Sequence, residues 1–125
     1  MILDTNAVSA LFLGEPSLAQ VLVPVDLPYL PAVVIGEYRY GLCRSRHRGR
    51  LEALLEILIR DSVVLPVDEG TAACYATVRD ELRRKGRPIP ENDVWIAALA
   101  IQHGLPVVLR CTPRPRLVAS EMAVI

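Results

Sequence analysis

Short apolar runs alternate with longer helical segments along this 125-residue chain, and that alternation limits the fold more than any other feature. The predicted strands are residues 1–3, 28–30, 63–65 and 107–109, with a last edge strand at 122–124. The predicted helices are residues 7–13, a short one after Pro16, 32–42, 49–60, a long one from 68–71 to 83–85, and 91–103. Strands that alternate with helices predict an α/β fold, here a three-layer α/β/α sandwich with a short, mostly parallel central sheet. At this length we expect one domain, residues 1–125.

The overall charge is balanced, so it does not by itself point to nucleic acid or a membrane surface as a partner. Fourteen Lys and Arg residues face fourteen Asp and Glu residues, for a formal net charge of +0. Cys43, Cys74 and Cys111 are far apart and have no metal-ligand spacing, which indicates free thiols in a reducing compartment. The sequence shows no signal-peptide pattern and no apolar run of membrane-spanning length. We therefore expect a soluble, cytoplasmic protein.

Asp4 ends the opening apolar run and is the first candidate site residue. In open α/β sheets, ligands bind beyond the carboxyl ends of the strands, where an acid in this position would lie. The alternative is that Asp4 only caps the following helix, since Asp, Thr and Asn all cap helices well. For the helix at 7–13 the sequence offers Asn6 as a plausible cap and Gly14 as the stop.

Glu37 and Asp93 are two further acids whose positions in predicted helices are unusual. Glu37 shares a helical face with the apolar positions three and four residues away, and no Lys or Arg lies at 33, 34, 40 or 41. An acid on such a face is expected either to pair with an arginine or to face a metal. Asp93 falls in the first turn of its helix, where the dipole favours a carboxylate, and begins the apolar stripe Ile96, Ala97 and Ala100.

The positions of these three acids are explained together if Asp4, Glu37 and Asp93 converge on a divalent cation. Without one they would repel each other and raise each other's pKa values. A small set of oxygen ligands selects Mg²⁺ or Mn²⁺ over softer metals, and such an ion activates water for attack on a phosphodiester. The two histidines, His47 and His103, have no triad spacing, and there is no Gly-rich phosphate loop. Metal-assisted phosphodiester hydrolysis is the predicted reaction class.

Three segments resemble the main motifs of the PIN-domain family, and specifically of VapC-type toxins from VapBC toxin–antitoxin pairs. They are ILDTN at 2–6, VIGEYRYGL at 34–42 and IPENDVWIAA at 89–98, in the family's order and spacing. The resemblance implies a PIN-like fold, a Mg²⁺-dependent endoribonuclease, inhibition by a cognate antitoxin, and a homodimer. It also implies that Asp4, Glu37 and Asp93 are catalytic metal ligands, with Asn6 and Asn92 as supporting polar neighbours.

The tail departs from the pattern of the family it resembles. Relatives usually follow the fourth strand with Thr or Ser, Arg and then an acid, whereas this chain has Leu109, Arg110 and Cys111. A thiol is a poor Mg²⁺ ligand, so a second metal position and full activity are not assured. The alternative function is a catalytically weakened PIN-domain partner that binds an antitoxin and supports operator DNA binding.

A basic strip follows Glu37 and has two interpretations. Residues 39–50 hold five arginines and no acid, whereas residues 1–38 hold four acids and no Lys or Arg. Arg39, Arg44 and Arg46 are candidate RNA-backbone contacts, which would make binding sensitive to salt. Alternatively, the strip is a solvated helix junction that meets an acidic antitoxin tail.

Overall fold

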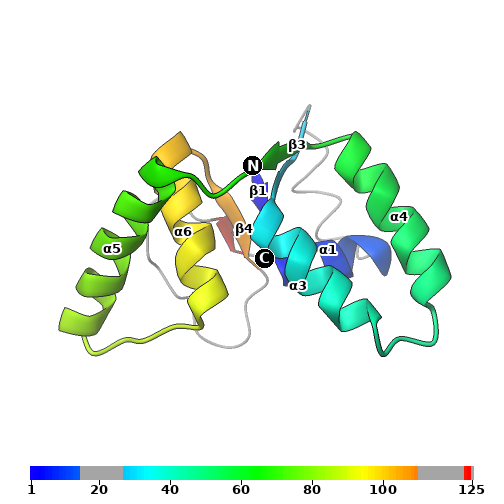
Figure 1. Ribbon diagram of the computed structural model, residues 1–125, viewed down its shortest axis with the longest axis horizontal. Helices are drawn as coiled ribbons and strands as arrows, with labels where there is room; N and C mark the ends of the chain where they lie inside the picture. The colour runs from blue at the N-terminus through cyan, green and yellow to red at the C-terminus, as the bar shows by residue number, and fades with distance from the viewer. Residues whose placement is uncertain (15–26, 110–122, 125) are drawn as a thin grey trace.

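The computed structural model describes residues 1–14, 27–109 and 123–124 of the chain (Figure 1). Five strands are described: β1 (Ile2–Leu3), β2 (Tyr29–Pro31), β3 (Val63–Leu65), β4 (Val107–Leu109) and β5 (Ala123–Val124). The described helices are α1 (Thr5–Phe12), α3 (Ala32–Leu42), α4 (Arg48–Arg60), α5 (Glu69–Arg84) and α6 (Glu91–His103). In this part of the chain, no helix is long and apolar enough to cross a membrane.

The strands form one sheet in the order β3-β2-β1-β4-β5, and every neighbouring pair is parallel. Ile2 pairs with Tyr29 on one side and Val107 on the other, so β1 is the central strand. The chain moves outward from β1 to β3 and then crosses to the other side at β4. Beside β1 the strand order therefore reverses, and that reversal is where α/β sheets bind ligands.

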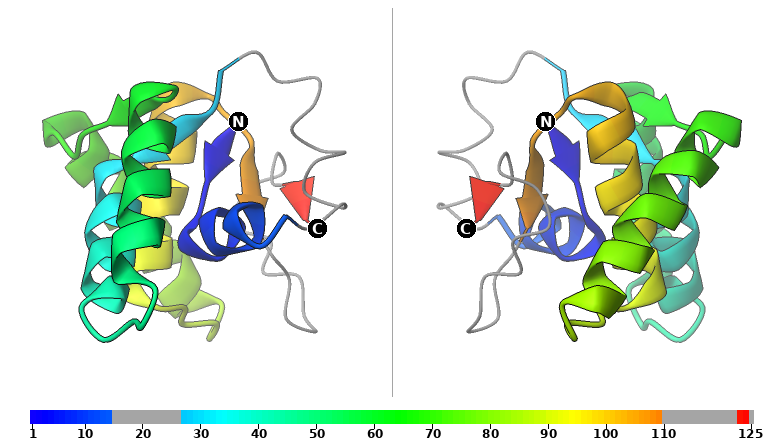
Figure 2. Two further views of the ribbon diagram at one scale, coloured as in Figure 1. Left: turned by 90° about the vertical axis from the view of Figure 1, so that its right-hand side faces the viewer. Right: turned by 90° about the vertical axis from the view of Figure 1, so that its left-hand side faces the viewer.

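The core is centred on β1 and continues into the two helix pairs that flank it. Ile2, Leu3, Leu30 and Val107 are fully buried, and helices α1, α3 and α6 add further buried residues to the same cluster. Figure 1 shows α3 and α4 on one side of β1, and α5 and α6 on the other. In both views of Figure 2 these four helices lie on the same side of β1 and β4. The inner helices α3 and α6 contact each other.

The predicted α/β class and the parallel arrangement of the sheet are confirmed. The helices predicted at 32–42 and 91–103 and the strands at 63–65 and 107–109 have the predicted bounds. One detail is wrong: α1 begins at Thr5 with Asp4 as its cap, two residues before the predicted start after Asn6. Because β1 passes directly into α1, Asp4 is the first residue after the strand that can cap the helix, and it takes the place expected for Asn6. The short helix predicted after Pro16 lies outside the described residues.

A buried threonine fastens the start of α5 to the end of α6. Thr71 is 0% exposed, and its hydroxyl donates to Gln102 Oε1 at 2.5 Å and accepts from the Asp68 backbone N–H at 3.1 Å. The Asp68 carboxylate accepts from the Thr71 N–H at 3.0 Å and from Gln102 Nε2 at 2.7 Å. These hydrogen bonds lower the pKa of Asp68.

Thr71→Val should therefore lower the free energy of unfolding by about 1–3 kcal/mol, because partially buried polar groups lose their partner while the volume is preserved. Urea denaturation followed by circular dichroism measures the change. Thr77→Val is the matched control, since the exposed Thr77 hydroxyl bonds only to the Ala73 carbonyl of its own helix. Equal losses for the two variants would contradict a special role for Thr71.

Candidate metal centre

Asp4 lies at the junction of β1 and α1, where it serves both elements. Its Oδ1 accepts the Ala7 backbone N–H at 2.7 Å, so the cap interpretation of Asp4 is confirmed. The residue is nevertheless only 6% exposed, and it follows the central strand at its carboxyl end. Asp4 is thus a cap whose carboxylate also lies at the reversal of strand order.

Glu37 is brought to the same region by α3, but not in the predicted way. The prediction that it lies on a buried face is wrong, because α3 buries Val34, Tyr38 and Leu42 and leaves Glu37 exposed. Its Oε2 accepts a hydrogen bond from Asn92 Nδ2 of α6 at 3.1 Å. Glu37 makes no ion pair with any residue that the structure describes. Its carboxylate is held by the neutral amide of Asn92.

Asp93 comes from the first turn of α6 and is half-buried. Its charge, together with that of Glu37, acts on Asp4. The pKa of Asp4 is raised from 3.8 to about 6, first by burial and then by the charges of Asp93 and Glu37, and the hydrogen bond from Ala7 only partly offsets this. The charges of Asp93 and Glu37 therefore both reach Asp4.

The three carboxylates gather without adopting the geometry of a finished metal site. Within residues 1–14, 27–109 and 123–124, no three or more His, Cys, Asp or Glu side chains are placed to bind one ion together. Glu37 is turned to Asn92, so a shared cation requires its side chain to swing toward Asp4. The residues fit a hard cation in two respects: the donors are all oxygens, and Asp4 carries buried charge next to two like charges.

Sequence reasoning missed Thr5 as a member of the site. Its Oγ1 is buried and has no hydrogen-bond partner in the structure. A buried hydroxyl without a partner costs free energy, and beside Asp4 a water or an oxygen ligand would satisfy it. Its place directly after Asp4 was the available signal. Of the two asparagines expected as neighbours, Asn92 contacts Glu37, whereas Asn6 is exposed on α1.

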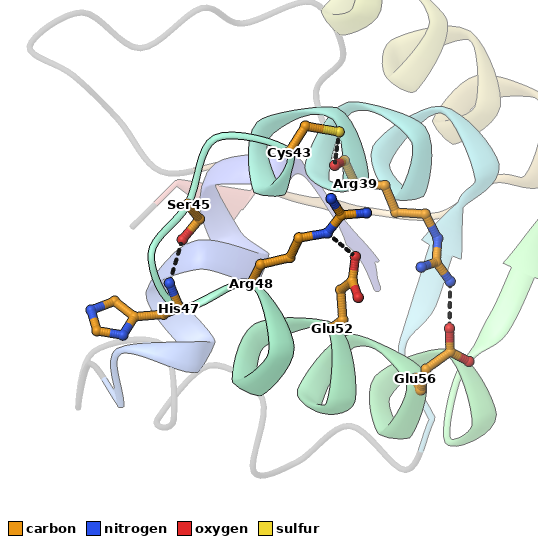
Figure 3. A network of polar contacts seen from close by, with 7 residues as sticks. All are labelled: Arg39, Cys43, Ser45, His47, Arg48, Glu52 and Glu56. Atoms are coloured by element: carbon orange, nitrogen blue, oxygen red, sulfur yellow. Dashed lines mark hydrogen bonds and ion pairs between the residues drawn. The ribbon is translucent and has the colours of Figure 1, made fainter.

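The arginine strip separates into paired and unpaired members. Arg39 Nη2 pairs with Glu56 Oε1 of α4 at 2.5 Å, and Arg48 Nε pairs with Glu52 at 2.8 Å (Figure 3). Arg39 thus joins α3 to α4 and is not a free cation. Arg44 and Arg46 lie at the exposed turn between the two helices and make no ion pair within the described part of the chain. They are the better placed of the three RNA-contact candidates.

Comparison with known proteins gives a consistent family of relatives. Residues 1–111 match the family model described as PIN domain. VapC ribonuclease Y4jK of Sinorhizobium fredii is 34% identical over 90% of this chain and 87% of its own length. Ribonuclease VapC5 of Mycobacterium tuberculosis is 34% identical over 86% of this chain and 79% of its own. The crystal structure of FitAcB from Neisseria gonorrhoeae matches with a TM-score of 0.74 at 30% identity, covering 86% of this chain and 85% of that one. DNA-bound VapBC from Salmonella typhimurium matches with a TM-score of 0.77 at 28% identity, over 86% and 83%.

Proposed function

Because the chain belongs to the PIN-domain family, among its VapC-type toxin ribonucleases of type II toxin–antitoxin pairs, we propose that it hydrolyses RNA with a divalent cation held by Asp4, Glu37 and Asp93. One observation supports the proposal: Asp4 follows the central strand where the strand order reverses, and the charges of Glu37 and Asp93, from two other elements, act on it. The oxygen-only donor set favours Mg²⁺, with Mn²⁺ as a substitute. The reaction is endonucleolytic cleavage by an activated water.

The residues divide the work according to where they lie. Asp4 is fixed by its cap bond to Ala7 and provides the most rigid oxygen. Glu37 would be the ligand that has to move. Its carboxylate accepts a hydrogen bond from Asn92, and metal binding would replace that bond. Asp93 lies at a helix N-terminus, where the dipole favours its ionised form. Asp4, Glu37 and Asp93 would hold the cation, which would supply charge neutralisation, polarisation of the phosphodiester and activation of a water.

The proposed partners follow from the relatives. Solved structures similar to this chain include FitAcB and a VapBC complex bound to DNA. We expect this chain to bind a cognate antitoxin, to form a homodimer, and to contact its RNA substrate with Arg44 and Arg46. Arg39 contributes by holding the α3–α4 pair that presents their turn.

The test is cleavage of a structured RNA by the purified chain, freed of antitoxin, in Mg²⁺ or Mn²⁺ and in EDTA. Cleavage that needs the metal and stops when the cognate antitoxin is added back supports the proposal. Cleavage that continues in EDTA, or in a preparation carrying Asp4→Asn, comes from a contaminant. A protein that binds antitoxin tightly and cleaves nothing under any of these conditions contradicts the nuclease function.

That last outcome is the second candidate function, a weakened partner that binds antitoxin and supports operator binding. Cys111 favours it, because the family pattern that the sequence resembles would have an acid at this position; the residue lies outside the described part of the chain. Cys111→Asp should raise metal-dependent cleavage about tenfold or more if the missing ligand limits activity, by analogy with the 10–100-fold effects of metal-supporting groups.

Initial rates at saturating Mg²⁺ measure the effect of Cys111→Asp. Cys43→Asp is the control, since it adds the same charge at an exposed position on the α3–α4 turn. No gain from Cys111→Asp in a chain that already cleaves RNA would show that three acids suffice.

A further inference from the structure

A pocket of about 350 Å³ lies between α5 and the loop that leads into α6. Its floor is apolar, from Leu82, Ile89 and Val94, and its rim carries Arg79, Arg83 and Glu91. The volume falls within the roughly 300–1,000 Å³ that is usual for small-molecule sites. None of these residues belongs to the metal centre, so this pocket is a separate feature.

The pocket and the metal centre share one turn of helix. In the first turn of α6, Glu91 and Val94 line the pocket, Asn92 donates a hydrogen bond to Glu37, and Asp93 lies between them in the sequence. A helix with its side chains is about 10–12 Å across, so a short stretch of single-stranded nucleic acid can reach from one side of the turn to the other. A ligand spanning both places would have a phosphate at the carboxylates and an adjoining group in the pocket.

The rim is already arranged by an aromatic pair. Tyr75 stacks on Trp95 with centroids 3.9 Å apart and planes 20° apart. The Tyr75 hydroxyl donates to Glu91 Oε1 at 3.1 Å, and Arg79 donates to the same hydroxyl. These contacts position Arg79 as a donor and Glu91 as an acceptor at the rim of the pocket.

We propose that this pocket is a nucleobase subsite, which takes an unpaired base next to the phosphodiester held at the metal centre. The proposal rests on the proposed function and specifies its substrate as RNA with unpaired nucleotides. The flat, apolar faces of a base suit the floor. Arginine side chains stack on bases and bind phosphates, and a glutamate accepts hydrogen bonds from an exocyclic amino group.

The charge around the pocket suits a polyanion such as RNA. Residues 79–91 hold five Lys and Arg side chains and three acids, in a chain whose overall net charge is +0. The rim ion pairs are exposed: Arg83 lies 2.9 Å from Asp80, and Arg79 lies 3.8 Å from Glu91. Such pairs contribute little, so exchanging them for contacts to RNA costs little.

The test compares the affinity for a short, fluorescein-labelled single-stranded RNA with that for an abasic ribose-phosphate strand of equal length. Fluorescence anisotropy is measured on the antitoxin-free chain in EDTA, so binding is read without cleavage. The wild-type chain should prefer the strand with bases by about tenfold, because seating a base against Leu82, Ile89 and Val94 removes apolar surface from water. Ile89→Trp, which fills the pocket, and Arg83→Gln, which removes a rim cation, should reduce that preference several-fold.

Two controls match these variants on the opposite helix pair. Ile57→Trp adds the same ring at an exposed isoleucine of α4, and Arg60→Gln removes an exposed arginine beside an acid. Both should keep the wild-type preference. Thermal melts of all four variants show whether each is folded, and Arg83→Gln serves as the test if Ile89→Trp is not.

Several results would overturn the subsite. The first is a wild-type chain that binds both strands with equal affinity. The second is a folded pocket variant that keeps the wild-type preference for bases, or that loses affinity for both strands equally. Release of a bound antitoxin by Ile89→Trp without any change in base preference would assign the pocket to a protein segment. A chain that shows the pocket-dependent preference and yet never cleaves in Mg²⁺ refutes the nuclease function and leaves the subsite intact.

Discussion

Asp93→Asn is expected to lower RNA cleavage roughly a thousandfold, because it removes a proposed charged ligand while keeping the size of the side chain and the helix around it. A metal supplies several kcal/mol of transition-state stabilisation, and each 1.36 kcal/mol corresponds to about a tenfold change in rate. Asn remains acceptable in the first turn of a helix, so the fold should persist. Cleavage lost in a folded protein therefore reports on the metal centre itself.

Initial rates over a range of Mg²⁺ and Mn²⁺ concentrations measure this loss. Asp61→Asn is the control, since Asp61 is an exposed acid that ends α4, and its replacement should leave the rate unchanged. If Asp93→Asn retained more than about a tenth of the wild-type rate at saturating metal, Asp93 would not be a ligand of the catalytic ion.

Asp4→Asn should make the metal-free protein more stable at neutral pH, even though it also abolishes cleavage. The pKa of Asp4 is raised from 3.8 to about 6, so the folded state holds this proton more tightly than the unfolded chain does. The stability that this group contributes is complete below the unfolded pKa and is lost as the pH rises through about 6. Removing the charge should raise the free energy of unfolding at pH 7 by about 1–3 kcal/mol. Asn also retains the cap bond to Ala7.

Urea denaturation in EDTA at several pH values measures this prediction. The difference between variant and wild type should be small at pH 4 and should grow toward pH 7. Added Mg²⁺ should raise the Tm of the wild-type chain and leave that of Asp4→Asn nearly unchanged, because only the former binds the ion preferentially when folded. A variant less stable than the wild type at pH 7 would mean that burial and the neighbouring acids do not raise the pKa of Asp4.

Glu37 marks a limit of what the sequence could predict about the site. Apolar residues occur around most of α3, so the spacing that placed Glu37 on an apolar face was real but did not identify the buried one. The packing against the sheet and α6 buries Val34, Tyr38 and Leu42 and leaves Tyr40 72% exposed. Glu37 is thereby exposed and accepts the hydrogen bond from Asn92, and an accessible carboxylate suits a ligand better than a buried one does.

Other features depended on contacts between residues far apart in the sequence. The local patterns predicted the strands, most helices and the acids at their ends, because these follow from spacing and end signals. They could not show that Arg39 meets Glu56, seventeen residues away and on another helix. Nor could they show which strand becomes central, since that depends on pairing between Ile2 and Val107.

The pairing of β1 with β4 also determines when in synthesis the protein can become harmful. A ribosome that has made the chain only as far as α5 has released Asp4 and Glu37 but neither Asp93 nor the strand that flanks β1 on its other side. Pairing over such a sequence distance is slow. A nascent chain therefore cannot complete the proposed metal site until α6 and β4 have emerged.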